Sequence, residues 1–311
     1  MTRHIIKGSI LAVWAVLMVW WWHEHRSWPE PEKIDAVFLP DYLDNFGLEY
    51  GGRKVGWADK SLRRLQDGSY QAGESATILL ELSGHEVEVR LESSAELDPS
   101  FNLVGYRYLL QAGPLSLLQT GTVKEGRLTV DLNLGQYREM VESLYADYAH
   151  LLGERAAVFN PGQVNVPAPK GPALASLFPH YIAAQGLKAG QTFTLAAFDP
   201  FTRSLVSVNA RVESETRLVD QDTAREVPAF ELGMAAGSGA AASREIFMIN
   251  RHGRVFTEDG PMGYRLSRTI DENEARRGVV PLAPPAPLQG LLSTGPLKDL
   301  MTNIIRERLG D

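Results

Sequence analysis

Apolar and polar residues alternate strictly in two stretches of this chain, and this alternation restricts the possible fold more than any other pattern. The apolar members are Val87, Val89 and Leu91 in the first stretch and Leu128, Val130, Leu132 and Leu134 in the second. Successive side chains of a strand point to opposite faces of its sheet, so each stretch predicts a strand with one buried and one solvated face. Neither pattern fits an amphipathic helix.

Turn signals between such stretches indicate how the strands connect. Gly51-Gly52, Asp67-Gly68 and Glu125-Gly126 are typical hairpin turns, and turn signals recur at spacings of about 12 to 17 residues. These spacings are too short for crossover helices, so we expect sequential antiparallel strands in a meander. Alternation resumes at 206–212, with further candidate strands up to residue 269. The two runs of strands can form one continuous sheet or two lobes.

Two helices are predicted between the two runs of strands. Apolar residues recur at helical spacing over 137–152, and a second helix is expected over 174–185, ended by Gly186. Residues 160–172 between them are expected to form a loop. The predicted fold is therefore mainly β (α+β): a large curved antiparallel sheet or half-barrel with two packed helices. Its domain is expected at 45–270, with a helical insert at about 136–186.

The N-terminal region predicts one transmembrane helix. Residues 5–22 form an almost unbroken apolar run that would extend about 27 Å as a helix, close to the roughly 30 Å hydrocarbon core of a bilayer. Arg3 and Lys7 precede it and acidic residues dominate after it, which places the N-terminus in the cytoplasm. A cleaved signal peptide is the alternative, but the small residues of a cleavage site are missing. We expect a single-pass protein of a bacterial inner membrane, with 1–26 as cytoplasmic tip and anchor and the main domain in the periplasm.

Segments that contain proline flank the predicted domain. Residues 27–44 are expected to form a spacer, and residues 271–311 a proline-rich tail with an amphipathic terminal helix. The candidate docking residues of this helix are Leu297, Leu300, Met301, Ile304 and Ile305. The helix can dock to a partner or a membrane surface, or it can pack on the protein's own sheet.

Composition excludes several classes of function. The formal net charge is -7 and no basic block occurs, which argues against a nucleic-acid partner. The chain has no cysteine, so a thiol nucleophile, a thiolate zinc site and a disulfide framework are all excluded. Stability must come from packing, and no cofactor is expected.

No motif predicts catalysis or metal binding. His23-Glu24-His25 matches no standard ligand spacing, and Gly237-Ser238-Gly239 lacks the helix that follows a nucleophile elbow. Asp220 and Asp222 are interpreted as a solvated pair, and His252 as part of a hairpin turn. We therefore expect no catalytic residues, no metal site and no enzyme activity, with a hydrolase as the least supported alternative.

Five short segments carry a resemblance to a known family. They are LEYGGRKVGW (48–57), SSAELDPSF (93–101), GLKAGQ (186–191), FDPFT (198–202) and DGPMGY (259–264). Together they resemble a bacterial envelope β-domain of uncharacterised function that often precedes a transglutaminase-like domain. No such domain follows Thr269 here, and the helix at 137–152 looks like an insertion.

A looser similarity connects such sheets to periplasmic lipoprotein carriers and lipid-binding half-barrels. It implies a curved sheet around an apolar cavity, with both helices lying across its concave side. The ligand-facing candidates would then be Val87, Val89, Leu91, Leu128, Val130 and Leu132. These patterns favour a membrane-anchored envelope protein that binds a lipid, a lipoprotein or another hydrophobic ligand. The alternative is an accessory or scaffold subunit of an inner-membrane, transporter-type complex.

Overall fold

One continuous antiparallel sheet dominates the protein. The computed structural model describes residues 39–82, 85–112, 115–133, 163–199, 204–236, 243–260 and 263–283. Within them, fourteen strands pair in the order β8-β7-β6-β5-β4-β3-β2-β1-β14-β13-β12-β11-β10-β9. The strands are β1 (Tyr42–Tyr50), β2 (Arg53–Arg64), β3 (Tyr70–Leu82), β4 (His85–Leu97), β5 (Leu103–Ala112), β6 (Leu115–Lys124), β7 (Arg127–Asn133), β8 (Val164–Pro167), β9 (Thr192–Asp199), β10 (Ser204–Asp220), β11 (Arg225–Ala236), β12 (Ser243–Asn250), β13 (Val255–Asp259) and β14 (Tyr264–Thr269).

The meander predicted for the early strands is confirmed, and the choice between one sheet and two lobes is settled. Each strand from β1 to β8 pairs with the next, and so does each strand from β9 to β14. Six residue pairs between β1 and β14 then join the two runs, from Asn45 opposite Thr269 to Tyr50 opposite Tyr264. The sheet is open, because β8 and β9 lie at its two edges.

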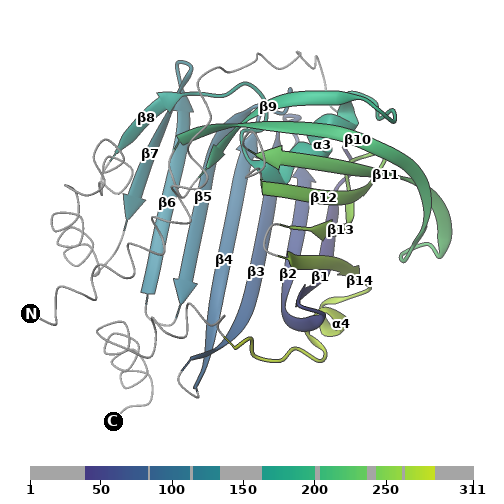
Figure 1. Ribbon diagram of the computed structural model, residues 1–311. Helices are drawn as coiled ribbons and strands as arrows, with labels where there is room; N and C mark the ends of the chain where they lie inside the picture. The colour runs from purple at the N-terminus through teal and green to yellow at the C-terminus, as the bar shows by residue number, and fades with distance from the viewer. Residues whose placement is uncertain are drawn as a thin grey trace, which may run out of the picture.

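The sheet is strongly curved. In Figure 1, β9 to β13 turn across the long early strands, and α3 (Phe178–Ala184) lies in the curve between them. The edge strand β9 reaches the inner face of β5, where the rings of Phe198 and Tyr106 lie 5.4 Å apart. The Phe198 amide also donates a 2.5 Å hydrogen bond to the Ala173 carbonyl.

The helix predicted over 174–185 is confirmed as a short, buried element. A 3-10 turn, η3 (Ala175–Leu177), leads into α3, where Pro179 sits in the first turn and six of the seven residues are buried. Gly186 follows it with φ +82°, the left-handed conformation that favours glycine after a helix. A further short helix, α4 (Glu272–Arg276), is capped by Asp271, whose side chain accepts from the Glu274 amide.

The predicted loop at 160–172 contains a strand, and that prediction was wrong at this point. Val164–Pro167 forms β8, in which Val166 lies opposite Leu128 and Val164 opposite Val130. A four-residue strand is too short to show clear alternation, and Pro167 suggested a loop. Proline is nevertheless tolerated in an edge strand, where one row of backbone groups needs no partner.

Several predictions lie outside the described residues. These are the helix at 137–152, the apolar run at 5–22, the segment Gly237-Ser238-Gly239, and the terminal helix with Leu297, Leu300, Met301, Ile304 and Ile305. In the part of the chain that the structure describes, no helix has both the length and the apolar character needed to cross a bilayer.

Candidate functional site

A polar row crosses the inner face of the sheet. Residues directly opposite each other in paired strands share a face, and the register places one polar residue on each of six neighbouring strands. The row consists of Asp44, Lys60, Glu74, Ser93, Tyr108 and Gln119. It divides the inner face into two sides. One side lies under α3, and the other lies across the polar row from α3.

The side under α3 is buried. The neighbouring register row contains Leu62, Ala72, Ala95, Tyr106 and Val130, all of them buried. The imidazole Nε2 of His180 on α3 lies 2.7 Å from the Tyr42 hydroxyl at one end of this row, and the two rings stack. Burial, reinforced by the nearby Lys60 ammonium, lowers the pKa of His180 to about 3, so its ring is neutral.

Beyond the polar row the inner face stays apolar but is less well covered. Phe46 and Ala58 are buried in the next register row, whereas its members on β3 to β6 are only partly buried. Those members are Ala76, Leu91, Leu110 and Leu117, and Ile78, Val89 and Ala112 continue the surface in the row after that. This stretch is therefore a partly accessible apolar surface on the inner face of the described sheet.

Lys60 lies in the polar row and pairs with two carboxylates. We call Lys60, Glu74 and Glu258, together with Tyr264 and Glu245, the polar centre. Its Nζ lies 2.6 Å from Glu258 Oε2 on β13 and 3.1 Å from Glu74 Oε1 on β3. Burial alone would lower the pKa of Lys60, but the two carboxylates outweigh burial and hold this pKa above its usual value. Lys60 is therefore a permanent cation and not a nucleophile.

Two further groups complete the polar centre. The Tyr264 hydroxyl donates a 2.8 Å hydrogen bond to Glu258 Oε1, and burial together with the Glu258 charge raises the pKa of Tyr264, which keeps it protonated. Burial, and next the Glu258 carboxylate, raise the pKa of Glu245 on β12 to about 7. Glu245 is thus the group in this centre that changes charge near neutral pH.

A small pocket opens beside Lys60 on the side of α3. It is lined by polar groups that include Tyr42, Glu74, Ser93 and Ser176, and its volume is about 20 Å³. That volume is about what one water molecule needs. The pocket suits a bridging water and is too small for an organic ligand.

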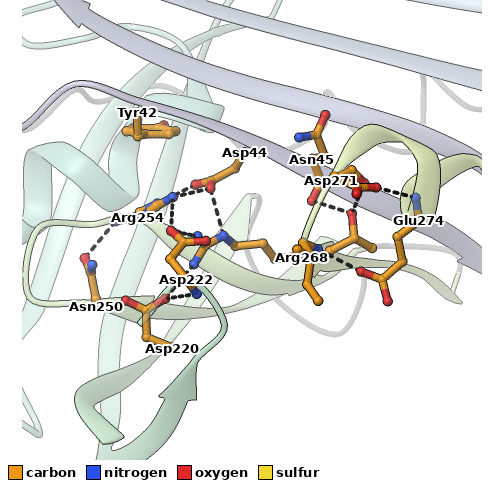
Figure 2. Close-up of polar contacts among 12 residues, drawn as sticks. Tyr42, Asp44, Asn45, Asp220, Asp222, Asn250, Arg254, Arg268, Asp271 and Glu274 are labelled. Carbon is orange, nitrogen blue, oxygen red and sulfur yellow. Dashed lines mark hydrogen bonds and ion pairs between the residues drawn. The ribbon is translucent and has the colours of Figure 1, made fainter. Parts of the chain in front are cut away.

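A cluster of five ion-paired residues, the clasp, holds the tip of the β10–β11 hairpin against β1 and the late strands. Figure 2 shows Arg254 and Arg268 between Asp44 on one side and Asp220 and Asp222 on the other. Arg254 donates to both Asp44 oxygens at 2.7 and 2.5 Å. Burial would raise the pKa of Asp222, but Arg268 and Arg254 hold it below its usual value. The predicted solvated carboxylate pair is therefore part of a structural network.

The candidate ligand-facing residues all lie on the inner face, but their positions differ. Leu128 and Val130 lie on the α3 side of the polar row and are completely buried, and Val87 is buried as well. Val89 and Leu91 are partly buried beyond the polar row, and Leu132, opposite Gln119, is partly buried at its end. The structure therefore separates fully buried candidates from partly buried ones.

The polar centre was missed by the sequence analysis. Lys60 occupies the same alternation phase as the buried Ala58 and Leu62, and Glu258 the same phase as the buried Phe256. A charge in the apolar phase of a strand is a detectable signal for a buried ion. Its partner is not detectable in this way, because Lys60 and Glu258 lie 198 positions apart.

Other predictions about individual residues can be placed. His252 lies in the turn between β12 and β13, as predicted, and its amide donates to the Asn250 side chain. In the described residues, no group of three histidine, aspartate or glutamate side chains is arranged to hold a metal ion.

Comparison with known proteins identifies a fold and no family. No family model matches the chain, and no curated protein matches it. The fold is similar to the crystal structure of a β-barrel-like protein of a domain of unknown function, DUF1849, from Brucella abortus. That match has a TM-score of 0.52 at 10% identity and covers 75% of this chain and 97% of the other. At this identity the likeness extends to the fold, so the resemblance to an envelope β-domain holds only as a β-domain of unknown function, without the transglutaminase context.

Proposed function

We propose that this chain is a membrane-anchored envelope protein that binds an amphiphile, such as a lipid or a lipoprotein, along the inner face of its sheet. The observation that carries the proposal is the partly buried apolar surface beyond the polar row. The residues on β3 to β6 that form it share one face by register: Ala76, Ile78, Val89, Leu91, Leu110, Ala112 and Leu117. An apolar face of this extent gains free energy when it is removed from water.

The polar row supports an amphiphile over a purely apolar ligand. Leu91 is two residues from Ser93 on β4, and Leu110 is two residues from Tyr108 on β5. An acyl chain that lies on the apolar rows would therefore place its polar end near hydroxyl groups and the Lys60 centre. Such a combination of apolar walls with a few polar groups is typical of ligand sites.

The apolar run at 5–22 supports a location at the membrane. It would hold the domain on the periplasmic side of a bacterial inner membrane, within reach of lipids and of newly exported lipoproteins. The ligand would be met at that membrane, which favours hand-off over free transport. The alternative role as a complex subunit depends on the terminal helix, which lies outside the described residues.

Native mass spectrometry of the full chain tests this proposal. Protein extracted in a mild detergent should carry an additional mass that survives detergent removal and that fragments as a lipid or acylated species. The double variant Leu91→Gln/Leu110→Gln should lose this mass. The matched control is Glu92→Gln/Arg107→Gln, which changes the opposite face of the same two strands and should keep it. Wild-type protein that always appears at its bare mass would refute amphiphile binding.

A further inference from the structure

The polar centre contains more carboxyl groups than cations. Lys60 is its cation, and Glu258 and Glu74 both pair with it, with Nζ–Oε distances of 2.6 and 3.1 Å. These three groups together carry one net negative charge, and ionised Glu245 adds a second. Because Lys60 is already neutralised by its partners, it offers no free positive charge to an anionic ligand.

Glu245 is the carboxyl group of the polar centre that has no ion pair or hydrogen bond within the described part of the chain. It lies on the inner face, two residues from Phe247, which is opposite Glu258 on β13. The charges of Glu258, Lys60 and Glu74 all act on its pKa, which places its carboxyl group close to theirs. An ionised carboxylate that is largely removed from water is costly without a partner. A cationic group at this position would supply that partner.

The polar centre borders the apolar surface that lies across the polar row from α3. Glu74 is on the inner face of β3, two residues from Ala76, which belongs to that surface. The Glu74 side chain is 22% exposed, whereas those of Lys60 and Glu258 are each 8% exposed. For a head group at the edge of the apolar surface, a carboxylate is therefore more accessible than the Lys60 ammonium.

The clasp adds no free cation to this environment. Its Asp44 lies directly opposite Lys60 in the register of β1 and β2. The clasp contains three aspartates and two arginines, and each arginine pairs with at least two of the aspartates. Both charged clusters thus have a negative excess, which attracts cations and repels anions.

We propose that the amphiphile bound along the inner face has an ammonium group at its polar end, and that Glu74 and Glu245 accept hydrogen bonds from it. An ammonium group has three donors, and charge-assisted bonds to carboxylates are about twice as strong as neutral ones. A fatty carboxylate would instead meet groups of its own charge. This inference rests on the proposed function and adds the charge class of its ligand.

Glu245 also makes the binding dependent on pH. The charged groups around its carboxyl group are Glu258, Lys60 and Glu74, and the Tyr264 hydroxyl on β14 binds Glu258. Lys60 stays charged and Tyr264 stays protonated, whereas Glu245 has a pKa of about 7. An ammonium ligand favours the ionised form of Glu245. Its affinity should therefore rise about tenfold between pH 6 and pH 8, in proportion to the ionised fraction.

Three amphiphiles with the same dodecyl chain test the proposal: dodecylammonium, dodecanol and dodecanoate. The full chain is held in a non-ionic amphipol, and isothermal titration calorimetry measures each dissociation constant at pH 6 and pH 8. The variant Glu245→Gln removes the unpaired carboxylate. Glu88→Gln is the matched control, because Glu88 is exposed on the outer face of β4.

A further comparison identifies the source of the ammonium group. Lyso-phosphatidylethanolamine represents a phospholipid and Nα-lauroyl-lysine amide an acylated peptide, and each is compared with a form whose amine is acetylated. Acetylation should weaken binding about tenfold for the true source. Affinities that acetylation leaves unchanged in both ligands would contradict the proposal.

At pH 8 the wild type and Glu88→Gln should bind dodecylammonium at least about tenfold more tightly than dodecanoate, with dodecanol in between. Glu245→Gln should bind dodecylammonium at pH 8 about as weakly as the wild type does at pH 6. Dodecanoate that binds as tightly as dodecylammonium would overturn the inference, and so would wild-type affinity of Glu245→Gln at pH 8. If none of the three amphiphiles binds, amphiphile binding itself is refuted, whereas binding without preference for dodecylammonium refutes only the ammonium head group.

Discussion

Lys60 and Glu258 form a 2.6 Å ion pair across the inner face of the sheet, although β1 and β14 lie between their strands. In a flat sheet, three strand spacings would place β2 and β13 about 14 Å apart. The pair can form directly because the sheet is strongly curved at this point. The ion pair therefore depends on the curvature of the sheet as well as on the residues of the polar centre.

The first prediction concerns this ion pair. Lys60→Met leaves Glu258 and Glu74 without their cation, and we expect the free energy of unfolding to fall by about 3–5 kcal/mol. Urea unfolding followed by circular dichroism measures this change. Arg217→Met is the control, because Arg217 pairs with Glu226 on an exposed hairpin and such pairs contribute less than about 1 kcal/mol. Equal losses in the two variants would contradict a structural role for the buried pair.

The second prediction concerns Glu245 and pH. The pKa of Glu245 is about 7 in the folded protein and 4.5 as the ordinary value, so between these values the folded state holds a proton that the unfolded state has lost. Stability should therefore fall as pH rises from about 4.5 to 7, by an amount on the order of 2–3 kcal/mol. In Glu245→Gln the side chain stays neutral, and this loss should disappear.

Unfolding midpoints at pH 5, 6, 7 and 8 check the role of Glu245. Glu226→Gln changes an exposed carboxyl group and should leave the pH profile of the wild type unchanged. A Glu245→Gln profile that coincides with that of the wild type would show that Glu245 does not cause the dependence.

The third prediction concerns the contact between α3 and the β12–β13 turn. A Cβ on Gly253 would lie 2.5 Å from His180 Cα and from the Pro179 carbonyl oxygen, and φ at this glycine is +77°. Gly186 has a similar φ of +82° with no atom within 4 Å of such a Cβ. Gly186→Ala should therefore cost only the backbone strain of about 1–2 kcal/mol.

Gly253→Ala should cost about 1–3 kcal/mol more than Gly186→Ala, because it also pushes α3 away from the sheet. Thermal unfolding of the two variants measures the difference. Identical shifts of the midpoint would show that α3 does not pack tightly on this turn.

The sequence predicted local features of the fold well, because strict alternation has one simple interpretation. β4 and β7 follow from their patterns, and Gly186 was predicted to end a helix. The β1–β14 pairing could not be predicted, since it joins residues more than 200 positions apart through backbone groups that every residue has. β8 was missed because four residues with a terminal proline carry no periodic signal.

The candidate site was predictable only in part. The alternation of Val89 and Leu91 placed them on the apolar face, where both are partly buried. The same pattern assigned Leu128 and Val130 to that group, but α3 and β9 cover their side of the polar row. Coverage by distant elements is a tertiary property, and alternation does not report it.

Photo-crosslinking on β5 tests the central claim most directly. A photoreactive amino acid at Leu110, on the inner face, is compared with one at Arg107, which is exposed on the outer face of the same strand, in cells that express the full chain. The account predicts a crosslink from position 110 to a lipid or an acylated protein, and none from position 107. A crosslink from position 110 only to the protein's own residues 134–162 would show that the chain covers its apolar face itself, and would contradict amphiphile binding.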